Sequence, residues 1–335
     1  MKLRYFALLS IASIVVNADV SARAASFNLT QTWTPSFPTS SITTDAFSYI
    51  RSNWYTSGAY APDDINFVKD PIDTNSTSMV LKVNYPAGSY APVATKNGSG
   101  GIKGGAEFFS TPNGNNQYNT ALLSYDVAFD STFNWVKGGK LPGLFGGLPA
   151  GKGCSGGEKA NGDNCFSIRL MWREGGKLCI SAGEAYAYIP TSDSLCQSKQ
   201  VVCNSDYGTS FSRGIIRFSN MKWTHIDIYV KLNSGSNTNG ILEVWQDGSL
   251  MINQQHIQFR SNENLGISSF MFSTFFGGST RNYATPVDTS TYFRNIEFST
   301  GNTPDPVGGN TAASLHVSSL SYAVIVLVAL YQIFI

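Results

Sequence analysis

The stretch Phe166-Ser-Ile-Arg-Leu-Met-Trp-Arg173 decides the fold class, because apolar and polar side chains alternate along it with a period of two. One face carries Phe, Ile, Leu and Trp, while the other carries a hydroxyl, a thioether and two guanidinium groups. In a β-strand, successive side chains point to opposite faces of the sheet. The stretch therefore predicts a half-buried strand whose open face is rich in polar chemistry.

Other segments extend the β assignment along the chain. Residues 183–189 place Glu184, Tyr186 and Tyr188 on one face and small or apolar residues on the other. A hairpin is predicted to turn at Asp247-Gly248. No segment has the pattern of a convincing amphipathic helix, so we predict an all-β protein, an antiparallel β-sandwich of jelly-roll type. The remaining predicted strands are 121–129, 224–232, 241–252, 267–276 and 292–298.

The composition agrees with an extracellular β-protein. Charged residues make up 13% of the chain, against roughly 25% in ordinary soluble domains. The formal net charge is +1 and no basic run is present, which argues against nucleic acid as a partner. No linker or repeat divides the central part, so residues 25–298 are expected to form a single domain.

Both ends of the chain carry targeting features. An apolar run behind two basic residues predicts a signal peptide over residues 1–18, with cleavage as late as residue 24 as the alternative. Residues 299–314 are rich in Gly, Pro and Thr and predict a flexible stalk. The tail 315–335 ends in an uncharged apolar run, which indicates a GPI-anchor signal, the alternative being a tail-anchoring helix. We therefore expect a secreted protein on the plasma membrane or cell wall, with its lipid anchor as the only membrane contact.

Cysteine usage fits the same compartment. Cys154 and Cys165 bracket a Gly-rich insertion, and Cys196 and Cys203 bracket a short polar loop. Two disulfides are predicted, each closing one of these loops near the candidate site described below, although spacing alone leaves other pairings open. Cys179 is left over and is interpreted as a buried free thiol. The sequons that predict a glycoprotein are Asn28-Leu-Thr30, Asn75-Ser-Thr77 and Asn97-Gly-Ser99.

The residue types argue against the common hydrolytic sites. Between the predicted signal peptide and the tail, the only histidines are His225 and His256, and neither has metal-ligand spacing. A zinc site and a Ser-His-Asp triad are therefore poorly supported. A glycosidase would have to assemble its two carboxylates from distant positions, because no compact acidic cluster is present.

Lysine, arginine and tyrosine on open faces suit another reaction. The stretch Lys137-Gly-Gly-Lys-Leu-Pro-Gly-Leu-Phe-Gly-Gly147 predicts a glycine-dense loop with two lysines. Polyuronide lyases neutralise the sugar carboxylate, remove the C5 proton with a base and protonate the departing O4 with an acid. Tyrosine can serve as base or acid once nearby cations lower its pKa from about 10. Lys140 and Arg169 would supply that cationic field.

Structural interpretations of the same residues remain open at this point. The Tyr-x-Tyr pair is compatible with ordinary strand packing, Lys140 with a simple turn, and Arg173 with a structural ion pair. Asp227, Tyr229 and Lys231 also share a strand face, which we assign to the solvated outer surface.

Several separated motifs, in order, resemble the alginate and glucuronan lyase superfamily. Over residues 108–298 the chain is similar to the secreted fungal proteins of polysaccharide lyase family 14, which are related to family 20 glucuronan lyases. This resemblance implies a jelly roll with a substrate groove on its concave sheet. The motifs are the run Trp135 to Gly147, Cys165-Phe-Ser-Ile-Arg-Leu-Met-Trp-Arg173, Glu184-Ala-Tyr-Ala-Tyr-Ile-Pro190, Phe275-Phe-Gly-Gly278, Thr285-Pro286 and Tyr292-Phe293.

The resemblance implies catalytic roles for four residues. Tyr186 or Tyr188 would exchange protons with C5 and O4, while Lys140 and Arg169 would handle the carboxylate. The implied activity is β-elimination on an acidic, uronic-acid-containing polysaccharide. The alternative is a non-catalytic carbohydrate-binding or cell-wall protein on the same fold.

The expected substrate-binding residues are Ser167, Arg173, Glu107 and Lys137. Ser167 would position a catalytic residue by hydrogen bonding, and Lys137 would lie at the periphery. Glu107 stands where the resemblance leads us to expect a neutral glutamine, so its charge would retune the substrate or weaken activity. No cofactor is required by this chemistry, a structural calcium ion is left open by analogy with relatives, and a monomer is expected.

Overall fold

The computed structural model describes residues 20–56, 58–98, 100–114, 116–147, 153–175 and 180–301. The predicted signal peptide, the GPI-anchor tail, the stalk beyond residue 301, Cys179 and the side chain of Asn97 lie outside these residues. No helix in the described ranges is long and apolar enough to cross a membrane.

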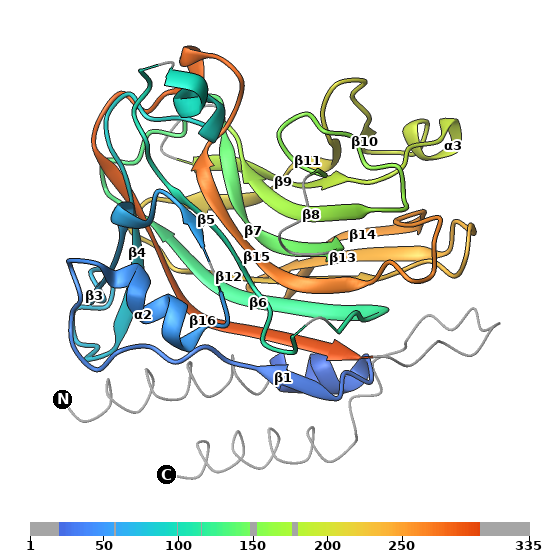
Figure 1. Ribbon diagram of the computed structural model, residues 1–335, viewed down its shortest axis with the longest axis horizontal. Coiled ribbons are helices and arrows are strands. Elements are labelled where there is room, and N and C mark those ends of the chain that lie inside the picture. The colour runs from blue at the N-terminus through green and yellow to red at the C-terminus, as the bar shows by residue number, and fades with distance from the viewer. Residues whose placement is uncertain are drawn as a thin grey trace, which may run out of the picture. The chain divides into compact units, whose positions relative to one another are not determined.

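Two antiparallel sheets form a β-sandwich, which confirms the predicted fold class (Figure 1). Sheet A has the order β14-β13-β12-β6-β16-β4-β3, with β1 also paired to β16, and sheet B has the order β10-β11-β9-β8-β7-β15-β5-β2. Sheet A consists of β1 (Gln31–Trp33), β3 (Ile65–Lys69), β4 (Met79–Tyr85), β6 (Thr120–Phe129), β12 (Thr224–Lys231), β13 (Gly240–Gln246), β14 (Ser249–Ile257) and β16 (Thr289–Gly301). Sheet B consists of β2 (Ala59–Tyr60), β5 (Ala106–Ser110), β7 (Gly139–Gly147), β8 (Cys165–Trp172), β9 (Ile180–Tyr188), β10 (Val201–Val202), β11 (Thr209–Ser219) and β15 (Ile267–Phe276).

Helical segments are short and lie outside the sheets. They are the helical residues 20–26, α2 (Ala46–Asn53), α3 (Asp193–Cys196), and the 3₁₀ turns Pro62–Asp64, Pro92–Gly98 and Arg281–Tyr283. The predicted hairpin turn is present, because both Asp247 and Gly248 adopt positive φ between β13 and β14. That conformation matches the type I′ turn that connects two twisted antiparallel strands.

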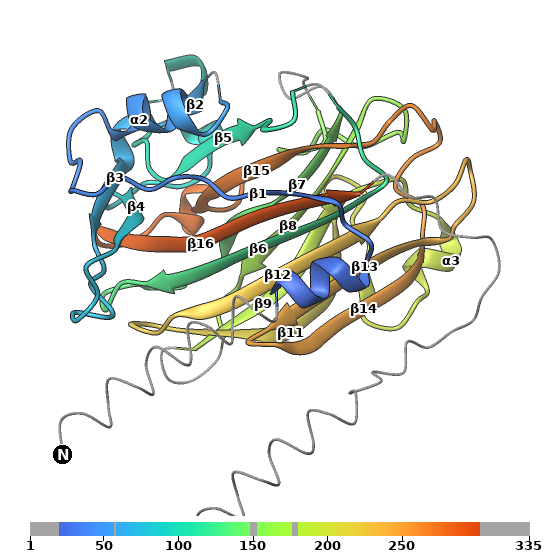
Figure 2. The ribbon, with the colours of Figure 1, turned by 90° about the horizontal axis from the view of Figure 1, so that it is seen from below.

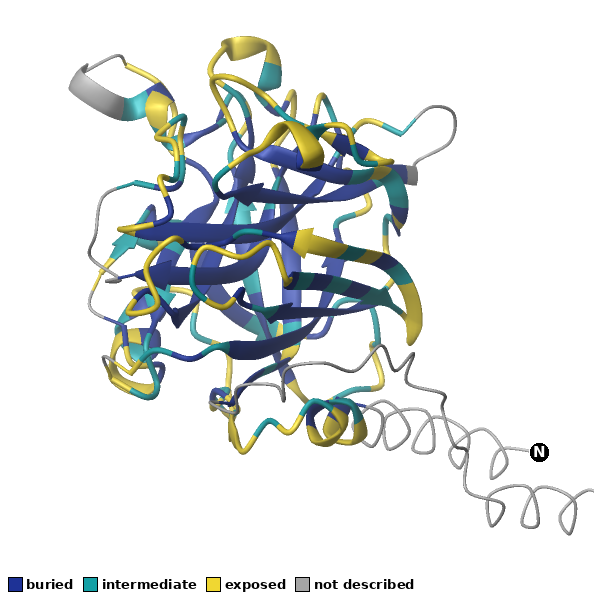
Figure 3. Cartoon of the chain, turned by 90° about the vertical axis from the view of Figure 1, so that its right-hand side faces the viewer, coloured by how far each residue is buried: buried dark blue, intermediate teal, exposed yellow. Residues whose placement is uncertain are grey.

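The core lies between the two sheets and confirms the alternation along β8. Phe166, Ile168, Leu170 and Trp172 are fully buried members of one hydrophobic cluster with the inward side chains of β12. Burying each such side chain contributes about 1.5–3 kcal/mol relative to leaving it exposed. Figure 3 shows the result as buried strands bordered by exposed loops.

The glycine-dense stretch that we expected to be a loop is instead strand β7, placed between β8 and β15 in sheet B. A Cβ atom on Gly139 would lie 2.1 Å from the ring of Trp172, and one on Gly146 would lie 2.1 Å from the ring of Phe166. The glycines therefore make room for the large aromatic side chains of β8. Sequence reasoning treated them as turn residues, whereas here they permit close packing inside a sheet.

A segment before β1 covers part of the outer face of sheet A (Figure 2). Arg23 pairs with Asp227 and lies over the ring of Trp245, and Phe27 stacks on Tyr229 with ring centres 3.7 Å apart. Asp227 and Tyr229 are consequently buried, so our assignment of them to a solvated surface was wrong.

These contacts also shift the expected domain boundaries. The contacts of Arg23 place residues before 25 in the folded domain, so cleavage at residue 24 would remove them. At the other end, β16 continues to Gly301, and Thr300 pairs with Gln31. The first three residues of the expected stalk therefore belong to sheet A.

Candidate active site

The candidate site lies on the face of sheet B that points away from the core. Strand register brings its residues together: Tyr186 of β9 lies opposite Arg169 of β8, and Arg169 lies opposite Gly143 of β7. Two residues beyond Arg169 on β8, Met171 lies opposite Lys140 of β7. Residues far apart in the chain thus become neighbours on adjacent strands.

Lys140 has an unusual environment for a lysine. Its Nζ lies 3.1 Å from the Sδ of Met171 and 4.3 Å from the ring centre of Tyr186. Burial, and then the positive charges of Arg169 and Arg173, hold the pKa of Lys140 well below its usual value. This environment favours the neutral amine, which can accept a proton.

The two tyrosines are held by backbone groups of different loops. The Oη of Tyr186 accepts the N–H of Gly208 at 2.9 Å, and the Oη of Tyr188 accepts the N–H of Gly157 at 3.0 Å. Burial raises the pKa of Tyr186, and this effect exceeds the opposing effect of Arg169. We expected cations to lower the tyrosine pKa, and for Tyr186 that expectation was wrong. Its phenol stays protonated and can donate its own O–H.

Arg169 is enclosed rather than open to solvent, with 1% of its side chain exposed. Its Nη1 donates to the Oγ of Ser273 at 3.0 Å and lies 3.8 Å from Oε2 of Glu107. Ser273 in turn donates to Glu107 at 2.8 Å. The carboxylate of Glu107 therefore compensates the buried guanidinium, a contact that sequence reasoning did not foresee.

Two of the predicted substrate-binding residues make structural contacts. Ser167 donates to the carbonyl oxygen of Cys154 at 2.6 Å, so it anchors a loop and does not hydrogen bond to a catalytic candidate. Lys137 lies apart, with its Nζ 5.6 Å from the ring centre of Tyr283.

The face expected to be open is covered in part by the loop 153–164. The disulfide between Cys154 and Cys165 closes this loop, and Gly157 within it reaches Tyr188. A second disulfide joins Cys196 and Cys203. Both predicted pairings are confirmed.

A buried carboxylate that sequence reasoning left without a role stands beside Lys140. Glu184 is fully buried and accepts hydrogen bonds from Arg173 at 3.0 and 2.6 Å, from Arg213 at 2.7 Å and from Ser210 at 3.1 Å. Arg173 therefore forms an ion pair with Glu184, which is the structural interpretation that the sequence had left open for it. The strand alternation already placed Met171 and Glu184 on this face, but the cross-strand partner Arg213 could not be read from it.

Sheet A contains a separate polar cluster around His225. Nδ1 of His225 lies 2.7 Å from Asp126, and Nε2 lies 3.2 Å from Asp227. Burial opposes the charged imidazolium, but the hydrogen bonds to both aspartates raise the pKa of His225 to about 10. Among the described residues, no group of three or more His, Cys, Asp or Glu is placed to hold a metal ion.

Sheet B therefore brings the amine of Lys140, the phenols of Tyr186 and Tyr188 and the enclosed guanidinium of Arg169 to one face of a jelly roll. The family model Polysaccharide lyase 14 matches residues 73–296, and the chain belongs to this family.

Known relatives agree with that membership. The crystal structure of the marine PL-14 alginate lyase from Aplysia kurodai is 33% identical, covers 82% of this chain and 99% of its own, and superposes with a TM-score of 0.67. The alginate lyase vAL-1 from a Chlorella virus shares the fold at 24% identity, covering 74% of this chain and 93% of its own, with a TM-score of 0.56. Exolysin of Paramecium bursaria Chlorella virus 1 is 29% identical over 199 residues, which is 55% of this chain but 30% of that protein. The match thus spans less than a third of this curated relative's length.

Proposed function

We propose that this protein cleaves an acidic, uronic-acid-containing polysaccharide by β-elimination. The observation that carries the proposal is the desolvated amine of Lys140, set against Met171 and the ring of Tyr186 on the outward face of sheet B. The Aplysia relative is described as an alginate lyase, so alginate is the first substrate to test and glucuronan the second.

In this proposal Lys140 is the base. Its neutral amine takes the proton from C5 of the uronate and becomes an ammonium ion, while the C5 electron pair forms the C4–C5 double bond. The lowered pKa of Lys140 supports this role, because an ordinary lysine is protonated at neutral pH. The base is thus assigned to lysine, where the sequence had suggested tyrosine.

Tyr186 is the acid in the same proposal. Its O–H proton passes to O4 as the C4–O4 bond breaks, and the N–H of Gly208 stabilises the phenolate that forms. The proton held by Lys140 then returns to the phenolate, whose ring centre is 4.3 Å from Nζ, and both groups are restored. Tyr188, whose phenol lies beside that of Tyr186, is the alternative acid.

Arg169 acts on the uronate carboxylate through its electric field. Because 1% of its side chain is exposed, the field rather than a surface contact stabilises the negative charge that develops at C5 and the carboxylate. The carboxylate of Glu107 weakens the field of Arg169. Arg173 adds little to this field, because its charge is neutralised by Glu184.

The test is direct. The protein is mixed with alginate, with glucuronan and with other acidic glycans, and the ultraviolet absorbance of the unsaturated uronate product is followed. A rise in absorbance is expected with at least one polyuronide. Measurable binding without any absorbance change would refute the lyase and leave the carbohydrate-binding alternative.

We also propose that the protein works as a monomer outside the cell on a lipid anchor. The two disulfides support an oxidising compartment. Release from cells by a GPI-specific phospholipase would test the anchor. The proposed chemistry requires no cofactor, so a chelator should leave turnover unchanged; loss of activity would reopen the structural calcium ion.

A further inference from the structure

We propose that a pocket beside Tyr188 is a binding subsite for one uronate unit of the substrate, and that Lys159 pairs with the carboxylate of that unit. The unit would be the neighbour of the sugar that loses its C5 proton. This inference rests on the proposed function and adds to it a second anion-binding position.

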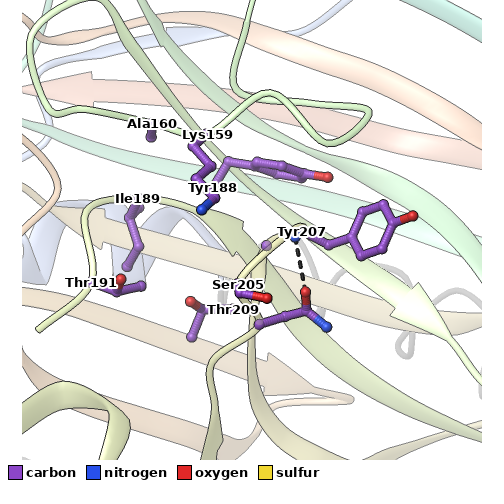
Figure 4. A pocket seen from close by; sticks show the side chains of 10 residues that line it. Lys159, Ala160, Tyr188, Ile189, Thr191, Ser205, Tyr207 and Thr209 are labelled. Carbon is purple, nitrogen blue, oxygen red and sulfur yellow. Dashed lines mark hydrogen bonds between the residues drawn. The ribbon is translucent and has the colours of Figure 1, made fainter. Parts of the chain in front are cut away.

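The pocket lies between the loop that the Cys154–Cys165 disulfide closes and the segment 204–209, which directly follows the Cys196–Cys203 disulfide (Figure 4). It encloses about 100 Å³, which is room for a single sugar ring rather than a longer piece of chain, since one water needs about 10–15 Å³. Its lining residues are Lys159, Ala160, Tyr188, Ile189, Thr191, Asn204, Ser205, Tyr207, Gly208 and Thr209.

Its position makes the pocket continuous with the proposed reaction centre. Tyr188 belongs to both, and Gly208 lines the pocket while its N–H holds the phenol of Tyr186. The opposite loop supplies Lys159 to the pocket and the N–H of Gly157 to Tyr188. A polysaccharide that crosses the strands of sheet B from Arg169 toward β11 therefore reaches the pocket next after the tyrosines.

The chemistry of the lining selects an anionic, hydroxyl-rich ligand. Figure 4 shows the amine of Lys159 on one side of the pocket and the hydroxyls of Thr191 and Thr209 on the other. Lys159 is exposed, and within the described part of the chain no carboxylate forms an ion pair with it. The neighbouring Glu158 is not among the residues that line the pocket. An ammonium ion without a partner, facing hydroxyl groups, suits a uronate carboxylate and its ring hydroxyls.

Both walls of the pocket are shaped before any ligand binds. The Cys154–Cys165 disulfide closes one loop, and the Cys196–Cys203 disulfide anchors the other. In the second loop, Asn204 Oδ1 accepts the backbone N–H of residues 206 and 207 at 2.8 and 3.0 Å. Pre-shaped loops lose less conformational entropy on binding, which favours a specific subsite.

Binding can be measured apart from turnover in the Lys140→Ala background. Alginate and glucuronan di-, tri- and tetrasaccharides are titrated calorimetrically into this variant, with and without Lys159→Gln. We expect Lys159→Gln to weaken binding of the preferred trisaccharide by about tenfold, the loss of one charge-assisted hydrogen bond. The matched control is Lys222→Gln, an exposed lysine beyond the end of β11 that lies opposite to Thr209. This control should leave affinity unchanged.

A second probe tests the carboxylate itself. For an oligosaccharide whose carboxylates have been reduced to alcohols, Lys159→Gln should change affinity by less than twofold. An equal loss for the acidic and the reduced oligosaccharide would overturn the pairing with a carboxylate. If oligouronides bind and the wild-type protein cleaves them, but Lys159→Gln behaves like Lys222→Gln, the subsite is refuted while the lyase stands. If no oligouronide binds and none is cleaved, the proposed function itself fails.

Discussion

Replacing Lys140 by arginine separates the two roles that a cation can have in this site. Arginine keeps the positive charge but cannot accept a proton, because its pKa exceeds about 12. If Lys140 is the base, Lys140→Arg should lower kcat/KM by about 10²–10⁴-fold, the usual contribution of a general base. That loss corresponds to about 3–6 kcal/mol of transition-state stabilisation at about 1.4 kcal/mol per tenfold.

The structure explains why the positive charge of arginine at position 140 should not restore activity. The amine occupies a confined position, 3.1 Å from Met171 Sδ and 4.3 Å from the ring centre of Tyr186, where a neutral nitrogen is favoured. Initial rates from product absorbance measure the effect, and thermal melting checks that the variant is folded. Lys222→Arg, on the exposed surface, is the matched control. Activity of Lys140→Arg within tenfold of wild type would refute the assignment of Lys140 as base.

The pH dependence provides an independent check of the same assignment. A base must be neutral, so the rate should rise with pH through the pKa of Lys140, which lies well below its ordinary value of 10.5. An acid must be protonated, so the rate should fall only above the ordinary tyrosine value of 10.0, because the pKa of Tyr186 is raised. A rate that keeps rising above pH 10 would indicate a tyrosinate base instead.

Three further changes test the residues around the site and the stability of the β-sandwich. Glu184→Gln leaves two arginines facing a neutral group, and we expect about 2–4 kcal/mol of lost stability, seen as a Tm lower by about 5–10 °C. Because the carboxylate raises the pKa of Lys140, the acid limb of the rate profile should also move to lower pH. His225→Asn should flatten the pH dependence of unfolding: the raised pKa of His225 stabilises the fold fully below about 6.5, and this contribution is lost as pH rises toward about 10. Replacing Cys154 and Cys165 together by serine should cost about 3 kcal/mol for a loop of this length and raise KM, because the loop also holds a tyrosine.

Each of these three predictions has a control or an outcome that would contradict it. Glu174→Gln changes an exposed glutamate near the same strand end and should leave Tm and the rate profile unchanged. For the histidine, equal slopes of unfolding free energy against pH in wild type and variant would contradict the buried imidazolium. For the disulfide, an unchanged Tm with both cysteines replaced would show that the loop is held by its other contacts alone.

Much of the fold could be predicted because it depends on local order. The alternation in β8 and β9 identified which side chains share a face, since a strand turns successive residues to opposite sides whatever its partners are. The turn at Asp247-Gly248 could be read from two residues, because few residues tolerate positive φ. Strand β7 could not be predicted in this way. Its glycines are needed because the aromatic rings of the neighbouring strand occupy the space of a side chain, and the local sequence does not show this.

The sequence predicted which side chains share this face but not their electrostatics. Lys140, Arg169, Tyr186 and Tyr188 do lie on one face, but sequence could not reveal that Glu107 compensates Arg169 or that two arginines neutralise Glu184. Those partners come from strands and loops that only the sandwich brings near. The pKa of Tyr186 also moved against expectation, because burial raises it more than Arg169 lowers it.

The sequence by itself determined an all-β chain and the face that carries the amine, the phenols and the guanidinium, because these follow from side-chain period and residue type. Only the tertiary structure decided that the loop 153–164 covers part of this face, that β7 is a strand and that Lys140 is desolvated. Burial and charge compensation depend on what distant segments cover, and a local pattern contains no information about that cover.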